Sequence, residues 1–177
     1  MIYMIYFYGV NPTTYRSAIK ELDIVSRVLS LAKKENRGLS DGSLQSIARL
    51  LEAGINDHWP YSNSPDGFVA FHWLLETIAE PIVIERLLNF KSWSYWESTG
   101  LWDYFLSASP PYPVPSSPGR VPKVGYLSLE GMMRMLEAES HKTFSERDDC
   151  RAVRSEVLEV VESLLQDELP MLAIALN

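Results

Sequence analysis

The stretch Met1-Ile2-Tyr3-Met4-Ile5-Tyr6-Phe7-Tyr8-Gly9-Val10 decides the class of fold. It is rich in β-branched and aromatic residues, which favour strands, and it lacks the polar alternation of a half-exposed strand. The turn residues Asn11-Pro12-Thr13-Thr14 close it, and either threonine is a suitable cap for a following helix. We therefore expect residues 2–10 to form a strand that is buried on both faces of a small sheet.

Most of the remaining chain has helical periodicity. Apolar residues recur at spacings of three and four, and Ser, Thr, Gly or Pro stand where helices begin and end. The first of these segments is one helix or two with a kink near Asp23, and in the segment after Pro81 the apolar side chains Ile82, Ile84, Leu87 and Leu88 are expected to face inward. The pattern predicts about six helices, in residues 15–34, 43–53, 65–80, 81–88, 128–136 and 147–169.

Two further segments have strand character. Lys123-Val124-Gly125-Tyr126-Leu127 is predicted as a brief strand, and the apolar tail 171–176 fits either a strand or a final helical turn. Residues 107–122 lie between the aromatic middle of the chain and the first of these two segments. They hold six prolines and four serines, which predicts an ordered surface crossover. We expect one mostly helical α+β domain over residues 1–177, with one core and a small sheet.

Composition limits the cellular setting. Hydrophobic residues make up 46% of the chain and charged residues 22%, which is typical of a globular protein. The single cysteine, Cys150, cannot form an internal disulfide framework, so a reducing, cytoplasmic setting is expected. No basic segment and cleavage site mark a signal peptide, and no run of about 18 apolar residues predicts a membrane span.

The charge balance argues against nucleic acid as a partner. The net charge is −7 and the isoelectric point is near 5.0, so the surface field repels phosphate backbones. The basic residues are scattered, and Lys33-Lys34 and Lys91 are too isolated to form a patch.

No catalytic motif stands out in the sequence. A Gly-x-Ser-x-Gly elbow and a phosphate-binding glycine loop are both absent, and Cys150 follows two acidic residues that disfavour a thiolate. We predict no catalytic residue, no cofactor and no metal ligand set, and the sequence favours a protein that is not an enzyme. His72 belongs to the Phe68-Phe71-Leu75 stripe, which favours a structural histidine at the edge of the core.

Residues 90–106 are the most aromatic part of the chain. Two interpretations stay open: the rings fill the core, or they form a recognition surface, for which Tyr and Trp are well suited. His58 lies in a separate loop beside Asp57, where a base oriented by a carboxylate is conceivable. The candidate binding residues are therefore Trp93, Tyr95, Trp96, Trp102, Tyr104, His58 and Trp59.

Two stretches carry a family resemblance. The first is Met4-Ile5-Tyr6-Phe7-Tyr8-Gly9-Val10 with the helix after it, and the second is the Pro-rich loop that leads into Gly125-Tyr126-Leu127-Ser128 and a helix. Over about a third of the chain, they resemble uncharacterised bacterial proteins related to the YfbM-like family. The resemblance implies a mostly helical α+β fold and supplies no catalytic residue. The Trp-rich middle and the final helix over 147–169 depart from it.

Three functions remain open at this point. The first is a protein-binding module of the immunity or accessory type, which binds a partner protein through an aromatic surface, or a basic partner through the acidic face Glu156, Glu159 and Glu162. The second is a small-molecule-binding domain or enzyme with a pocket between residues 58–64, 93–102 and 107–122. The third is a homodimer joined by exposed aromatic residues. The sequence favours the protein-binding module.

Overall fold

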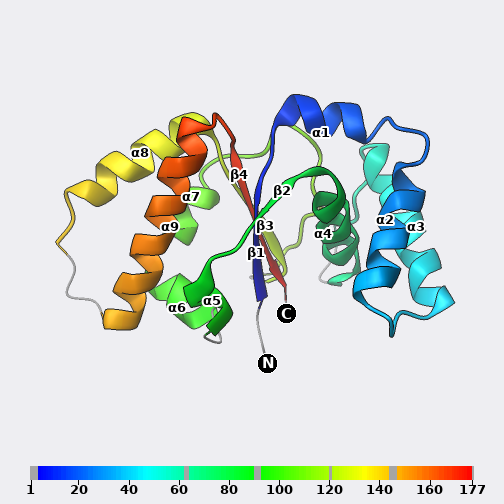
Figure 1. Ribbon diagram of the computed structural model, residues 1–177, viewed down its shortest axis with the longest axis horizontal. Coiled ribbons are helices and arrows are strands. Elements are labelled where there is room, and N and C mark those ends of the chain that lie inside the picture. Colours follow the sequence, from blue (N-terminus) through cyan, green and yellow to red (C-terminus); the bar gives the residue numbers. More distant parts are fainter. Residues whose placement is uncertain (1–3, 62–63, 90–92, 120, 144–146, 177) are drawn as a thin grey trace.

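The fold is a small antiparallel sheet with helices on both faces (Figure 1). The computed structural model describes residues 4–61, 64–89, 93–119, 121–143 and 147–176. The strands are β1 (Met4–Gly9), β2 (Glu80–Ile82), β3 (Lys123–Leu127) and β4 (Met171–Leu176), in the order β2-β1-β4-β3. The predicted mostly helical α+β class is confirmed.

The centre of the sheet is the pairing of β1 with β4. Met4 lies opposite Leu176 and Gly9 opposite Met171, so the two strands match over their whole length. On its other side β4 pairs with β3, from Lys123 opposite Ala175 to Leu127 opposite Met171. All six residues of β4 are buried, because a strand with neighbours on both edges and helices on both faces has no contact with water. The tail is therefore a strand and not a helical turn, and residues 2 and 3 of the expected first strand lie outside the described residues.

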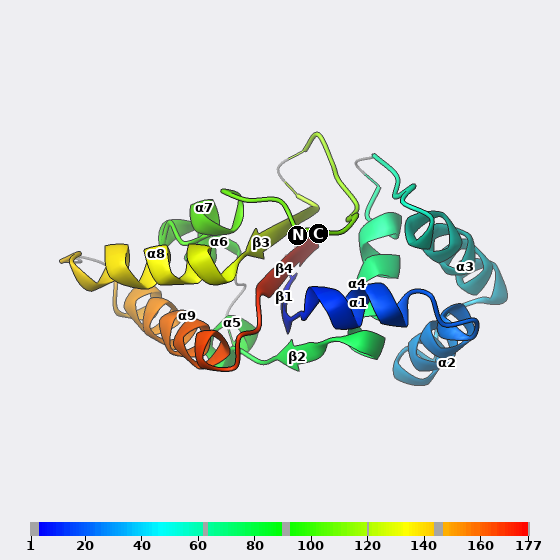
Figure 2. The same ribbon diagram turned by 90° about the horizontal axis from the view of Figure 1, so that it is seen from above.

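Four of the described helices lie on one side of the sheet, where Figure 2 shows them together; the last of them packs on the strands, and the second and third pack on its outer side. Asn11 caps the first of them, because its side chain accepts from the main-chain N–H groups of Thr13 and Thr14, so the cap is the asparagine and neither threonine. The first predicted helical segment is two helices separated by a turn. The four are α1 (Pro12–Ala18), α2 (Ile24–Glu35), α3 (Asp41–Ile55) and α4 (Asp66–Ile78).

The other face is covered by short helices and by one long pair. Ser128 caps α8 through the N–H of Gly131, as its position after a strand predicts. The aromatic segment, for which no secondary structure is assigned from the sequence, forms two short helices. The elements of this face are α5 (Glu85–Asn89), α6 (Trp93–Ser98), α7 (Trp102–Phe105), α8 (Leu129–Ser140) and α9 (Asp148–Gln166).

The sheet divides the apolar interior into two clusters, where the sequence suggested one core. Successive residues of a strand point to opposite faces, so Phe7 joins the cluster under α9 and Tyr8 joins the cluster under α4. Along β4, Ala173 joins the cluster under α9 and Leu172 joins the cluster under α4. Each cluster is closed by its own helical layer.

The segment after Glu80 differs from its predicted helix. Residues 80–82 form an edge strand along β1, with Pro81 opposite Tyr8, and the helix starts only at Glu85. A proline is tolerated on an edge strand because its missing N–H breaks no ladder bond there. Ile84 and Leu87 are buried as predicted, whereas Leu88 is 70% exposed, which corrects its expected inward position.

Within the described ranges, no helix combines the length and the apolar character needed to cross a bilayer.

Candidate functional site

The three tryptophans of the aromatic segment lie in the core. Trp93, Trp96 and Trp102 are 6%, 0% and 7% exposed, and all three belong to the cluster under α9. The ring of Trp96 meets Phe105 edge to face at 5.6 Å, and Trp93 meets Trp102 in the same way at 5.4 Å. The three indoles therefore fill the core, as the first of the two interpretations holds.

The two tyrosines of the same segment are half-buried, and Tyr104 joins a charged cluster. Its hydroxyl donates to the Glu139 carboxylate at 2.8 Å, and Lys142 donates to the same carboxylate at 2.6 Å. The guanidinium of Arg154 is ion-paired with Glu139 and donates to the carbonyl of Thr99 at 2.5 Å. Burial alone would raise the pKa of Glu139, but the bonds from Lys142 and Tyr104 and the charge of Arg154 outweigh it and lower that pKa. The cluster ties α6, α7, α8 and α9 together.

His58 and Trp59 lie on the opposite side of the sheet from the three tryptophans. His58 is exposed, and its Nδ1 contacts the main-chain carbonyl of Asn56 rather than the Asp57 carboxylate. Trp59 is half-buried with its ring edge to face against Phe71 at 5.3 Å. The structure thus separates these two residues from the indoles that the sequence grouped with them. It does bring their loop to the Pro-rich loop, through a bridge between Tyr61 and Ser116.

A buried polar cluster that the sequence did not single out lies between α4 and β1. The Tyr8 hydroxyl donates to Glu76 at 2.7 Å and lies 2.6 Å from His72 Nδ1. A hydroxyl has one proton, so Tyr8 accepts from the Nδ1–H of a neutral His72. Burial lowers the pKa of His72 to about 4 and raises that of Tyr8. The predicted place of His72 at the edge of the core is confirmed, since His72 is 9% exposed.

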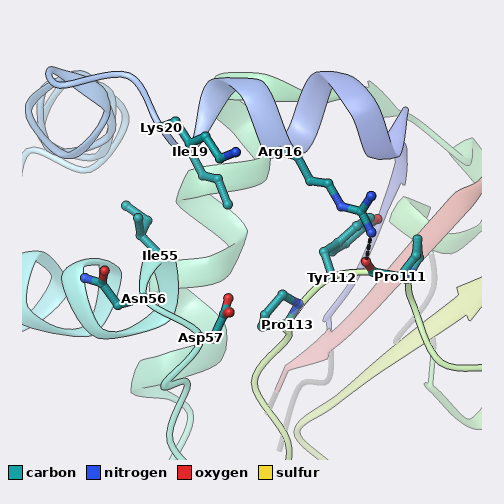
Figure 3. A pocket seen from close by; sticks show the side chains of 9 residues that line it. All are labelled: Arg16, Ile19, Lys20, Ile55, Asn56, Asp57, Pro111, Tyr112 and Pro113. Atoms are coloured by element: carbon teal, nitrogen blue, oxygen red, sulfur yellow. Dashed lines mark hydrogen bonds between the residues drawn. The ribbon is translucent and has the colours of Figure 1, made fainter.

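An open cleft of about 670 Å³ lies between α1, the end of α3 and the Pro-rich loop (Figure 3). Its residues are Arg16, Ile19, Lys20, Ile55, Asn56, Asp57, Pro111, Tyr112 and Pro113. Arg16 reaches across the cleft and donates from Nη2 to the carbonyl of Pro111 at 2.6 Å. Tyr112 stacks on Tyr15 of α1 with ring centroids 4.1 Å apart, which fixes the loop to the helix.

Asp57 adopts a left-handed backbone conformation in this cleft, with φ 66°. The N–H of Asp57 bonds to the carbonyl of Gly54, and the N–H of His58 bonds to that of Ala53, so the end of α3 is a Schellman motif. Glycine is the usual residue at this position, because a side chain disfavours φ > 0. The same motif ends α9, where Glu168 has φ 54°.

Most of the net negative charge lies in residues 123–177, which include α8 and α9. Residues 123–177 hold six basic and eleven acidic residues, a net −5 of the total −7. Glu156 does not belong to the free acidic face, because its carboxylate accepts from the N–H groups of Glu85 and Arg86 at 2.5 and 3.1 Å and so caps α5. The exposed acids on and after α9 that form no ion pair within the described residues are Glu159, Glu162, Asp167 and Glu168.

The described residues contain no group of three His, Cys, Asp or Glu side chains placed to bind a metal ion. Comparisons of the chain with family models, with curated proteins and with solved structures find no match. The resemblance to the YfbM-like family therefore stays a prediction.

Proposed function

We propose that this chain is a protein-binding module of the accessory or immunity type, and that it holds a basic partner against the carboxyl-terminal half of α9. The observation that carries the proposal is the set of exposed carboxylates there that form no ion pair within the described residues: Glu159, Glu162, Asp167 and Glu168. They are exposed, and most of the net charge of the chain lies in the same layer.

The position of Asp167 and Glu168 at the end of α9 costs stability. The carboxyl end of a helix carries partial negative charge, so an acid near it is unfavourable by about 0.3–1 kcal/mol. The last turn of α9 contains no basic residue, and Asp167 and Glu168 follow it directly. Glu168 also holds the left-handed conformation that glycine would adopt with less strain. Residues that oppose local preferences are expected where function requires them.

The acidic surface favours a basic partner over other proteins for two reasons. An acidic surface speeds the encounter with a positively charged protein, and it disfavours partners with negative surfaces. Together with the lone Cys150, these features support a module that acts in the cytoplasm.

The test is capture from native lysate at low and high salt, with binding measured again on the purified partner. The variant combines Glu159→Gln, Glu162→Gln and Glu168→Gly, and a control of equal charge change combines Glu35→Gln, Glu52→Gln and Glu80→Gln on exposed positions of other elements. We expect a stoichiometric basic partner that the wild type and the control bind and the α9 variant loses.

The same variant should be more stable than the wild type, because Glu168→Gly removes a negative charge just past the negative end of α9 and relieves the backbone strain at residue 168. A partner that binds the α9 variant as tightly as the wild type would contradict the proposal, as would the absence of any stoichiometric partner.

A further inference from the structure

The cleft of Figure 3 presents charges of opposite sign on facing walls. Arg16 and Lys20 stand four residues apart, Arg16 within α1 and Lys20 just past its end, so both cations reach the cleft from the same side. Asp57 directs its carboxylate into the cleft from the end of α3. Within the described residues, none of the three forms an ion pair. The cleft therefore offers both a cationic and an anionic side chain to a ligand.

Apolar side chains separate these charges. Ile19 and Ile55 line the cleft between its two walls, and Pro111 and Pro113 form its third side. Aliphatic and proline surfaces of this kind favour an aliphatic side chain on the ligand. The volume of about 670 Å³ lies within the range of sites for molecules of several linked groups, so it exceeds what one small ion needs.

The arrangement discriminates between ligand charges. A simple anion would meet the Asp57 carboxylate, and a simple cation would meet Arg16 and Lys20, so each would face repulsion at one wall. The guanidinium of Arg16 is already held by the Pro111 carbonyl, which fixes its position while other N–H donors stay free. A preorganised donor loses little entropy when a carboxylate binds to it.

We infer that this cleft binds a short zwitterionic peptide with an aliphatic side chain. Its terminal carboxylate pairs with Arg16 and Lys20, its terminal ammonium pairs with Asp57, and its side chain packs against Ile19 and Ile55. This site lies on the α4 side of the sheet, whereas α9 covers the other side, so it is separate from the proposed protein-binding surface.

The conformation of Asp57 makes the inference testable without loss of fold. A glycine at φ 66° relieves backbone strain, so Asp57→Gly is expected to keep or raise the thermal stability of the protein. Glu168→Gly makes the matching change in the Schellman motif of α9, far from the cleft. The pair separates the carboxylate in the cleft from the general effect of the substitution.

The experiment is isothermal titration calorimetry with four probes: L-alanyl-L-leucine, its N-acetyl derivative, its C-terminal amide and free L-leucine. We expect the dipeptide to bind tightest and each neutralised derivative to bind at least about tenfold more weakly, since each loses one charged hydrogen bond. Asp57→Gly and Lys20→Gln should weaken dipeptide binding by a similar factor, while Glu168→Gly and the exposed control Lys34→Gln leave it unchanged.

Three results would overturn the inference that the cleft binds a zwitterionic ligand, and a fourth would overturn its assignment to a peptide. The first is equal binding of the free and N-acetylated dipeptide, and the second is undiminished binding to a stable Asp57→Gly variant. The third is the absence of heat with the dipeptide at millimolar concentration, and tighter binding of free leucine than of the dipeptide would overturn the assignment to a peptide. Because Asp57→Gly leaves α9 intact, a negative result of the dipeptide titration would not count against the proposed basic partner of α9. A negative result of the capture experiment would likewise not count against peptide binding in the cleft.

Discussion

Between pH 7.5 and pH 5, protonation of His72 in the unfolded chain should destabilise the fold. Its imidazole is buried between α4 and β1, and its Nδ1–H is bonded to the Tyr8 hydroxyl, which in turn donates to Glu76. The half-buried ring of Tyr6 covers it at 4.2 Å, and Trp73 lies 5.0 Å away. These neighbours leave little water to solvate an imidazolium, so the folded state holds the neutral form.

The magnitude follows from the lowered pKa. A histidine in the unfolded chain titrates near 6.5, and His72 titrates at about 4 in the folded protein. Between these values the unfolded state binds more protons than the folded state, so stability falls as the pH falls. At about 1.4 kcal/mol for each pH unit, the full loss is about 3 kcal/mol, complete below about pH 4, and about 2 kcal/mol of it is reached at pH 5.

The assay is urea unfolding followed by tryptophan fluorescence at pH 7.5 and pH 5. His72→Asn keeps an N–H donor near the Nδ1 position and cannot titrate, so it should lose about 2 kcal/mol less than the wild type between the two pH values. The exposed His58→Gln variant should behave like the wild type. The reasoning is refuted if His72→Asn shows the same pH dependence as the wild type.

Two further predictions concern packing and charge. Gly54→Ala should destabilise the fold by about 1–3 kcal/mol, because the new methyl group overlaps the indole of Trp59. In Gly42→Ala the methyl group makes only an ordinary contact with Ser40 Oγ at 3.8 Å, so this variant should be neutral or stabilising; thermal unfolding of both variants checks this. Arg154→Met should cost about 1.5–3 kcal/mol at pH 7, since it leaves the buried Glu139 carboxylate with Lys142 and Tyr104 as its remaining partners, and much of the loss should be recovered in the double variant with Glu139→Gln.

Most elements of the fold could be predicted from local patterns in the sequence. The helical segments with clear caps and stripes, such as those of α3, α4 and α8, lie close to their predicted bounds, because their buried faces and end signals agree. The strand at residues 123–127 also occurs at the predicted place. The apolar tail stayed ambiguous, because a short apolar run has no period of its own, and its pairing with β1 is a contact between distant parts of the chain.

The sites depended on contacts that a linear pattern does not contain. His72 was recognisable as a buried histidine, but its bond to Tyr8 joins residues 64 positions apart. The cleft joins α1, the end of α3 and the Pro-rich loop, and the one signal in the sequence was the unusual length of that loop. Asp57 was noted only as a neighbour of His58, because its left-handed conformation appears only in three dimensions.

The pairing of β1 with β4 also sets an order for folding during synthesis. The partner of Met4 is Leu176, so β1 leaves the ribosome long before the strand that protects its inner edge. Helical segments can form within their own short stretches, whereas this sheet requires the ends of the described chain to meet. Until then, an apolar strand rich in aromatic residues is exposed, and a chaperone that shields it would prevent association with other nascent chains.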